Sequence, residues 1–528
     1  MMTPSAYDVA RQTFVILLPE ILLLLTGTVM MTAGAFVRLR REAWYGLAAV
    51  ALGVALMVLL ALGTVPTDPY ASVVLGDVFS YYSRLLLAFT GLIVLALAHD
   101  LVDDARAAEF FGALLFLNAG SMIVAASNDL VILFVGLELV SMPTYLLLYL
   151  PRRTTTTQEA VTKYFFLSIF SSGLLLFGLA YLYGVAGVSN LKALAYLCGH
   201  ASNVPESQLA LVALVFVVAG LGFRVAAVPF HFYAPDVYQG SPPVIAALLS
   251  WVPKAIGFLA LLRTVTAVVS AVDGASLLVH RAVVLAWIIS VVTMTLGNTV
   301  ALAQDNLKRL LAYSSIAHAG YLMIGVAVAF RNLPDSRFFF GAEGVLFYLT
   351  AYAFMTLGAF GVIILLSTPK RPVETVEDLA GLGRNHPVVA LAMAVCLLSL
   401  TGFPLLAGFW GKFELFASAL ALSSGADGNL YWSLALIAVL NSAVGAYYYL
   451  RIVVTMYLRP PAADSAVSRF SWPTSMAVTV CVLMTVGIGL YPLPVARATR
   501  LAAESAAERP DPIGRPGPIA AVPDAARR

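Results

Sequence analysis

The sequence predicts an all-α polytopic membrane protein with about fourteen transmembrane helices. Its 528 residues are 61% hydrophobic and only 11% charged. The mean hydropathy of +0.90 is too high for a soluble domain of ordinary composition. Apolar stretches of about 20 residues, the length that crosses a bilayer, recur along the whole chain.

The expected helices follow these apolar stretches in order. They cover residues 14–37, 43–65, 79–99, 109–126, 130–150, 160–186, 208–230, 241–266, 277–302, 307–330, 341–367, 387–420, 430–458 and 473–493. The first stretch is too long for the core of a signal peptide, so we expect a retained membrane helix there. The tail from about Arg497 is rich in Pro, Ala and Arg without apolar periodicity, and it is expected to be disordered.

Two of the stretches are interrupted by Pro and Gly, which break helical hydrogen bonding. The seventh contains Pro229 and the twelfth contains Pro404, so we expect broken helices 7 and 12. These prolines lie 175 residues apart (404 − 229), and the intramembrane residues Glu138 and His318 lie 180 apart (318 − 138). The nearly constant spacing predicts two similar five-helix repeats. Because five is an odd number, the second repeat must be inverted relative to the first.

The chain is expected to divide accordingly along its length. The parts are helices 1–3 (1–108), the first five-helix repeat with helices 4–8 (109–266), the second repeat with helices 9–13 (267–460), helix 14 (461–496) and the disordered tail (497–528). Paired broken helices in two halves are the sequence feature that points to a transport site.

Positive charges fall mainly in alternate loops. One set of loops holds Arg38, Arg40, Arg41, Arg106, Arg152, Arg153, Lys308, Arg309, Lys370, Arg371, Arg384, Arg459 and Arg469, and the other holds Lys192, Arg281, Arg331 and Arg337. Loops rich in Lys and Arg stay on the inner face of a membrane. Both termini are therefore expected on the outer face.

Charge and cysteine content exclude two other classes of function. The net charge of +3 is small and scattered, without a basic block interleaved with aromatics, so nucleic-acid binding is not expected. Cys198, Cys396 and Cys481 lie far apart, which indicates neither a metal cluster nor a disulfide framework. We expect them to be buried packing residues.

Two carboxylates stand within apolar stretches. Glu138 lies near the middle of an expected helix, where a carboxylate must pair with a cation, contact a water chain or become protonated. Proton transfer and a buried structural ion pair both remain open for it. Glu20, in LLPEILLL, is expected to form an interhelical hydrogen bond rather than to carry function.

Three lysines are candidates for proton transfer. Lys254 lies mid-helix in SWVPKAIGF, and the preceding proline frees a carbonyl one turn earlier that could bind it. Burial favours the neutral form of a lysine, which a reversible proton carrier requires, whereas a snorkelling lysine would lie near a helix end. Lys412 follows the second break and has the same character, nearer the outer end. Lys163 lies close to the inner face, where snorkelling is the alternative.

Arg224, His231 and His318 complete the set of candidate site residues. A guanidinium group stays protonated in proteins, so Arg224 is expected to act as a fixed charge that biases its neighbours. Imidazole titrates near neutrality, which suits a proton relay. A lone buried histidine is often only a hydrogen-bonded structural residue, so both interpretations stay open for His231 and His318.

Several motifs resemble those of a known family. They are GLELVSMPTYLLL, EAVTKYFFLSIFSSG, VPFHFYAPDVYQGSPP, LLSWVPKAIGF, QDNLKRLLAYSSIAHAGY and GFPLLAGFWGKF, spread over about residues 130–420. The sequence is similar to the antiporter-like membrane subunits of proton-pumping NADH:quinone oxidoreductase (respiratory complex I), which resemble subunits of multisubunit cation/proton antiporters. Within this family it most resembles subunit N, because Lys254 stands where subunit L usually has His and Lys412 where subunit M usually has Glu.

The resemblance implies a fourteen-helix fold with an inverted repeat and a proton route. In that route Glu138 pairs with the charged residue of broken helix 7, Lys254 is the central carrier, and Lys412 leads towards the outer face. One residue departs from the family pattern, because Arg224 stands where the family normally has Lys. We therefore expect Arg224 to stay charged and to switch its pairing with Glu138, while Lys254, Lys163 and water carry protons.

The resemblance also implies a function, namely a proton-translocating subunit of NADH:quinone oxidoreductase in the inner or plasma membrane of a bacterial cell. It implies membrane lipid and other complex I subunits, especially subunits M and K, as partners. Without a GxGxxG turn or a Cys array, this chain is expected to bind no cofactor, and NADH, FMN, iron–sulfur clusters and quinone are expected in partner subunits. A subunit of a cation/proton antiporter or of a membrane-bound hydrogenase would share these motifs and remains the alternative.

Overall fold

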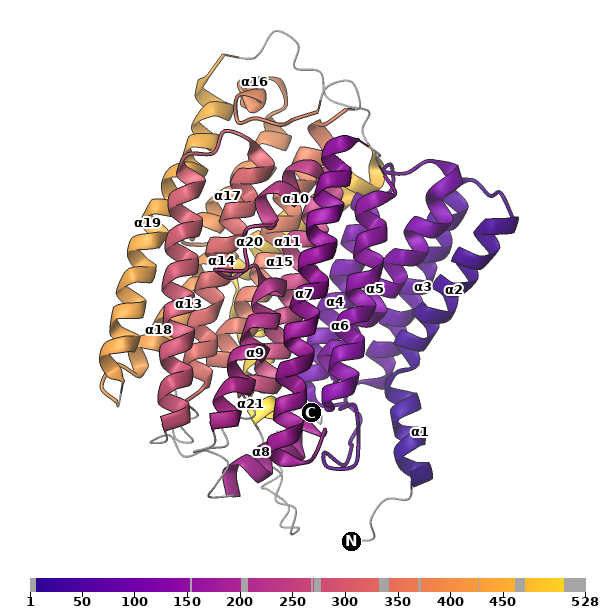
Figure 1. The fold of residues 1–528 in the computed structure, drawn as a ribbon. Coiled ribbons are helices and arrows are strands. Elements are labelled where there is room, and N and C mark those ends of the chain that lie inside the picture. Colours follow the sequence, from indigo (N-terminus) through magenta and orange to yellow (C-terminus); the bar gives the residue numbers. More distant parts are fainter. Residues whose placement is uncertain are drawn as a thin grey trace, which may run out of the picture.

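The computed structural model describes residues 6–151, 154–200, 208–266, 269, 277–331, 341–368, 372–425, 427–460 and 471–507. These residues form a broad bundle of helices without β-strands, with α2 and α3 at one edge and α19 at the other (Figure 1). Within the described residues, twelve helices are long and apolar enough to cross a membrane. Two broken helices add two further crossings, which confirms the predicted fold class.

The N-terminal helices precede the first repeat. They are α1 (Ala6–Ile16), α2 (Leu18–Phe36), α3 (Arg41–Leu62) and α4 (Val78–Leu97), followed by the short 3-10 helix η1 (Asp104–Arg106). The predicted interhelical role of Glu20 is confirmed, because Arg84 on α4 donates from Nε to Glu20 Oε1 at 2.7 Å and from Nη2 to Oε2 at 2.7 Å. Arg84 also donates to the carbonyl oxygen of Ile16 at 2.6 Å.

The Glu20–Arg84 pair gives a test of the packing of α2 on α4. The two side chains are only 1% and 4% exposed. Replacing Arg84 by Met leaves a buried carboxylate without its cation, so we expect a loss of about 3 kcal/mol in the free energy of unfolding. Thermal unfolding of the purified protein in detergent measures it. Adding Glu20→Gln should recover part of the loss, and a single variant as stable as the wild type would contradict this interpretation.

The first five-helix repeat contains a broken helix. Its helices are α5 (Ala107–Ala126), α6 (Leu130–Tyr149), α7 (Thr155–Ala186), the broken helix formed by α9 (Gln208–Val225) and α10 (Ala234–Gly240), and α11 (Pro243–Leu261), which continues as the π-helical turn η2 (Leu262–Thr266). A short helix, α8 (Leu191–His200), lies between α7 and α9. Asp129 begins α6 by accepting hydrogen bonds from the amides of Val131 and Ile132.

The second repeat has the same order of elements. Its helices are α13 (Leu277–Leu302), α14 (Leu307–Ala329), α15 (Gly341–Leu366), the broken helix formed by α17 (Pro387–Thr401) and α18 (Ala407–Ala421), and α19 (Gly428–Leu458), with the short elements η3 (Glu377–Leu379) and α16 (Leu382–Asn385) between α15 and α17. In both repeats the third helix packs against both halves of the broken helix: α7 contacts α9 and α10, and α15 contacts α17 and α18.

The two broken helices run in opposite directions. Figure 1 shows α9 in the lower half of the bundle and α10 in the upper half, whereas α17 lies in the upper half and α18 in the lower half. The breaks lie between Val225 and Ala234 and between Thr401 and Ala407, as Pro229 and Pro404 predict. This arrangement fits the inverted repeat.

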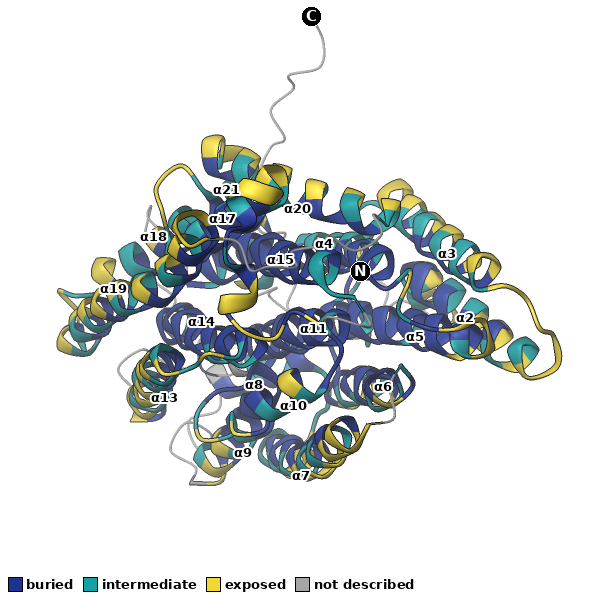
Figure 2. Ribbon diagram, turned by 90° about the horizontal axis from the view of Figure 1, so that it is seen from above, coloured by how far each residue is buried: buried dark blue, intermediate teal, exposed yellow. Residues whose placement is uncertain are grey.

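The most deeply buried helices lie where the two repeats meet. Viewed from above, α14, α11 and α5 form a central line of buried residues (Figure 2). The most apolar stretch of α11 is entirely buried, and those of α14 and α15 are 94% and 89% buried. Polar residues on these helices are therefore shielded from lipid.

One prediction about the C-terminus is wrong. Helix α20 (Trp472–Leu490) is followed by α21 (Leu493–Ala507), so the residues from Arg497 to Ala507 are helical rather than disordered. The buried side of α21, with Thr499, Ala502 and Ala503, packs against α4 and α15. The remainder of the expected tail, 508–528, lies outside the described residues.

Candidate functional site: a row of buried polar residues

Glu138 and Arg224 form an ion pair beside the first break. Arg224 lies in the last turn of α9, and its Nη2 donates to Glu138 Oε1 on α6 at 3.0 Å. Ser172 of α7 donates to the same carboxylate oxygen at 2.5 Å, and Arg224 Nη1 donates to Ser141 Oγ at 2.5 Å. The Arg224 side chain is 2% exposed and that of Glu138 is 23% exposed. The cation that Glu138 needs is thus Arg224.

Lys163 belongs to a separate charged cluster near the upper end of the bundle. Its Nζ donates to Asp236 Oδ2 on α10 at 2.7 Å and forms an ion pair with Glu159 at 2.7 Å. Arg309 of α14 donates to the other oxygen of Asp236 at 2.7 Å. Asp236 therefore connects the first repeat to the second. The Lys163 side chain is 40% exposed and contacts neither Glu138 nor Lys254 through a hydrogen bond.

This cluster gives a prediction for Asp236→Asn. The amide cannot bind both Lys163 and Arg309 as an anion, so we expect proton pumping to fall by about two- to fivefold, since partly exposed ion pairs contribute about 1 kcal/mol or less. Initial pumping rates in sealed membrane vesicles measure this. Asp236→Glu keeps the charge and should recover most of the rate. A rate at the wild-type level for Asp236→Asn would show that the contacts of Asp236 with Lys163 and Arg309 have only a structural role.

Lys254 lies on α11 and reaches across to the second repeat. Its Nζ donates to the carbonyl oxygen of Ser315 on α14, to Ser315 Oγ at 2.5 Å, and to the Tyr352 hydroxyl on α15 at 3.4 Å. The residue is 2% exposed, and no carboxylate lies within salt-bridge distance in the described part of the chain. Its bonding partner is thus on α14 rather than the carbonyl freed by Pro253. Hydroxyl groups can accept a hydrogen bond from an ammonium group and donate one to a neutral amine. This environment therefore suits both the protonated and the neutral form of Lys254.

His318 lies one turn beyond Ser315 on α14. Its Nδ1 is hydrogen-bonded to the Tyr348 hydroxyl and its Nε2 to the Tyr449 hydroxyl at 3.0 Å. Its ring centroid is 5.2 Å from that of Tyr352, which contacts Lys254. His318 is 1% exposed, and its ring centroid is also 5.8 Å from that of Tyr321, which contacts Lys412. It therefore stands between the two lysines.

Lys412 lies on α18 just after the second break. Its Nζ donates at 2.9 Å to the carbonyl oxygen of Thr401, the last residue of α17, and lies 4.9 Å from the centre of the Tyr321 ring. A cation at the carbonyl end of a half-helix is favoured by the helix dipole. Gly402 has a φ of +92°, and a Cβ there would lie 3.0 Å from Lys412 Cδ, so glycine leaves room for the lysine.

His231 lies in the first break, apart from the row. It is half-buried, its Nδ1 is buried without a hydrogen-bond partner among the described residues, and its ring contacts Phe232. The structure does not place it within hydrogen-bond distance of Arg224 or Lys254.

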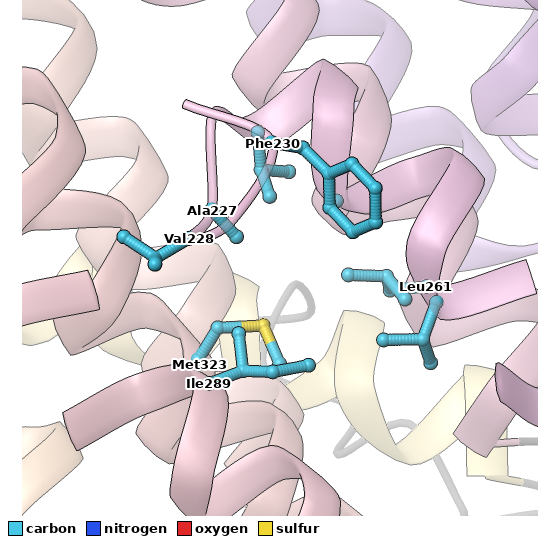
Figure 3. Close-up of a pocket in the computed structure, with 9 residues that line it drawn as sticks. Ala227, Val228, Phe230, Leu261, Ile289 and Met323 are labelled. Atoms are coloured by element: carbon cyan, nitrogen blue, oxygen red, sulfur yellow. The ribbon is translucent and has the colours of Figure 1, made fainter. Parts of the chain in front are cut away.

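A small cavity beside the first break is apolar. It has room for about one water molecule. It lies between the break and α13 and α14, and its lining residues are Val218, Gly222, Val225, Ala227, Val228, Phe230, Leu261, Ile289 and Met323 (Figure 3). A solute site would need convergent polar groups to orient its ligand. All residues that line this cavity are apolar, so the cavity does not have the character of a solute site.

Side chains that were not candidate site residues surround Lys254 and His318. Ser315 and Tyr352 are hydrogen-bonded to Lys254, and Tyr348 and Tyr449 to His318. The two groups meet where the Tyr352 ring packs against that of His318. The spacing of Tyr348 and Tyr352, four residues apart on α15, is the one signal that could have placed both on a single helix face. The three cysteines are buried and free, as expected.

The fold, with its paired broken helices, is that of an antiporter-like membrane subunit. Residues 127–456 match the family described as NADH:quinone oxidoreductase/Mrp antiporter, TM. The chain is 37% identical to NADH-quinone oxidoreductase subunit N of Trichlorobacter lovleyi, covering 90% of this chain and 94% of that one. It is 35% identical to the subunit N of Paramagnetospirillum magneticum, covering 92% and 96%.

Chains of solved membrane complexes have the same fold. A chain of respiratory complex I from Thermus thermophilus with bound aureothin has a TM-score of 0.74 at 32% identity, covering 92% of this chain and 99% of that chain. A chain of the Mrp complex from Dietzia sp. has a TM-score of 0.78 at 21% identity, covering 93% and 97%, which shows a shared fold. The chain belongs to the family of NADH-quinone oxidoreductase subunit N.

Proposed function

We propose that this chain translocates protons within a NADH:quinone oxidoreductase, driven by redox chemistry in partner subunits. The observation that carries the proposal is Lys254, a fully buried lysine whose partners are a carbonyl and two hydroxyl groups rather than a carboxylate. A buried ammonium group without a counter-ion is costly, so a modest change in the surrounding charge can drive the proton off. Lys254 can be hydrogen-bonded to these hydroxyl groups whether it is protonated or neutral.

The proposed route runs from the upper cluster to Lys412. Lys163 and Asp236 admit protons at the upper end of the bundle. Arg224 keeps its charge and biases the route through its pairing with Glu138. Its helix α9 packs closely on α11, where a Cβ on Gly257 would be 3.2 Å from Arg224 Cβ. From Lys254 the proton moves through the hydroxyl groups around His318 to Lys412. His231 has no step in this route.

The orientation and setting belong to the same proposal. Both ends of the described chain, α1 and α21, lie toward the lower end of the bundle in Figure 1. The loops richer in Lys and Arg lie at the other end, so the positive-inside rule places the lower end outside a bacterial plasma membrane. Subunits M and K are the proposed neighbours, and NADH, FMN, iron–sulfur clusters and quinone are proposed to bind partner subunits only.

Gentle affinity purification of the tagged chain from its own membranes tests this function. The proposal predicts that flavin, iron–sulfur centres and inhibitor-sensitive NADH:quinone reduction copurify with the chain. Recovery with other hydrophobic subunits alone, together with cation exchange in vesicles and no redox centre, would favour the cation/proton antiporter instead.

A further inference from the structure

Two buried carboxylates lie outside the row, one on α15 and one on α18. Glu343 is in the first turn of α15 and is 7% exposed, and Glu414 on α18 is 5% exposed. The two helices touch here, because a Cβ placed on Gly344 would lie 3.7 Å from the carbonyl carbon of Glu414. The carboxylates of Glu343 and Glu414 interact electrostatically across this contact. Neither residue belongs to the route described above.

Glu414 is incompletely satisfied in this position. Its Oε2 is buried and has no hydrogen-bond partner among the described residues. An ionised carboxylate with a buried, unpaired oxygen is costly, and protonation removes that cost. Two buried carboxylates in electrostatic contact cannot readily both ionise, so they are expected to hold one proton between them.

The groups around the pair connect it to the lower end of the bundle. Tyr82 on α4 is close enough to Glu414 for the charge of the carboxylate to act on it. The Tyr82 hydroxyl is hydrogen-bonded to Thr350 Oγ1 at 2.7 Å. Arg500 on α21 interacts with Glu343 and forms a 2.9 Å ion pair with Glu504. The Arg500 side chain is 48% exposed, so it lies between the buried pair and solvent.

Helix α21 is held over this site by packing and by a long-range contact. Lys192 donates to the carbonyl oxygen of Ala506 at 3.0 Å, and Ala502 and Ala503 are buried against the bundle. The Glu504 carboxylate, and to a smaller extent that of Glu343, raises the pKa of Arg500. Arg500 therefore remains a fixed cation that favours the ionised form of the carboxylate pair.

The composition of the site favours a proton over a metal ion. Within the described residues, no third His, Cys, Asp or Glu joins Glu343 and Glu414 in a group that could hold a metal. Calcium and magnesium need about six or more oxygen ligands, which two carboxylates do not supply.

We propose that Glu414 and Glu343 share one exchangeable proton and form the site from which this chain releases protons beneath α21. This inference rests on the proposed function. In the step, the O–H bond at the pair breaks first and its proton passes to solvent beside Arg500, whose charge favours the briefly ionised pair. An N–H bond of the Lys412 ammonium group then breaks and an O–H bond forms again on Glu414. The two side chains are two residues apart and leave α18 on different sides, so water conducts the proton between them and is returned unchanged.

Infrared difference spectroscopy and proton counting on the intact complex test this inference. The wild type should show the C=O band of a protonated carboxyl group that shifts in D₂O. Glu414→Gln should lose that band and release fewer protons per NADH, by about twofold or more, while Glu414→Asp recovers both. The control is Glu109→Gln, an exposed carboxylate at the start of α5. Glu343→Gln removes the other half of the pair and should also reduce the proton count.

The outcomes separate this inference from the proposed function. Lys254→Met, measured in the same preparation, reports on translocation by the row. If that variant lowers the protons per NADH while Glu414→Gln leaves both the band and the proton count at the wild-type level, the release site is wrong and the proposed function stands. A band that persists in Glu414→Gln, or that disappears from the wild type when sodium is added, would also overturn the shared-proton site. If Lys254→Met has no effect on the count, the proposed function fails, whatever the band shows.

Discussion

Replacing Arg224 by Ala is expected to abolish proton pumping. The substitution leaves Glu138 in its half-buried position without a cation and removes the hydrogen bond that Arg224 donates to Ser141. Truncating one member of such a pair costs about 3 kcal/mol or more where it is buried, and the fixed charge at the end of α9 disappears with it. NADH-driven acidification by sealed vesicles measures the loss, with the amount of assembled complex determined in the same vesicles.

Two further variants separate charge from proton release at this position. Arg224→Lys keeps a cation and should retain pumping. The double variant Glu138→Gln with Arg224→Met removes both charges, so it should recover assembly without recovering pumping. Normal pumping by Arg224→Ala would contradict the role of a fixed charge.

Replacing Lys254 by Met is expected to reduce proton pumping by about tenfold or more, because the only titratable group on α11 that connects the two repeats is removed. Assembly should persist, since the Tyr352 hydroxyl already donates to Ser315 Oγ at 3.0 Å and these hydroxyl groups stay paired. Coupled NADH oxidation and vesicle acidification measure the effect. Arg281→Met, which removes an exposed cation at the start of α13, is the control and should behave as the wild type. Pumping in Lys254→Met equal to that control would leave Lys254 with a packing role alone.

Much of the fold follows from local features of the sequence. The breaks at Pro229 and Pro404 and their constant spacing predict the paired broken helices, and a carboxylate such as Glu138 within an apolar stretch predicts a cationic partner. These features are local or depend on a single spacing, so one sequence is enough to recognise them.

The contacts between helices could not be predicted in the same way. Ser315 meets Lys254 from 61 residues away, and Tyr449 meets His318 from 131 residues away, because the packing of α11, α14, α15 and α19 sets these distances. The pairing of Lys163 with Asp236 of α10 likewise joins residues 73 apart in the sequence. Helix α21 is short and only weakly apolar, and its helical structure depends on packing against α4 and α15.

The most direct test of the central claim is the number of protons moved per NADH by sealed vesicles that carry Lys254→Arg, beside the wild type and Lys254→Met. Arginine keeps the positive charge and can donate to Ser315, but it does not release its proton. If Lys254 is a proton carrier, Lys254→Arg should oxidise NADH and move fewer protons per NADH, as Lys254→Met does. A wild-type proton count in Lys254→Arg would mean that a fixed charge suffices at this position, and it would contradict proton carriage by Lys254.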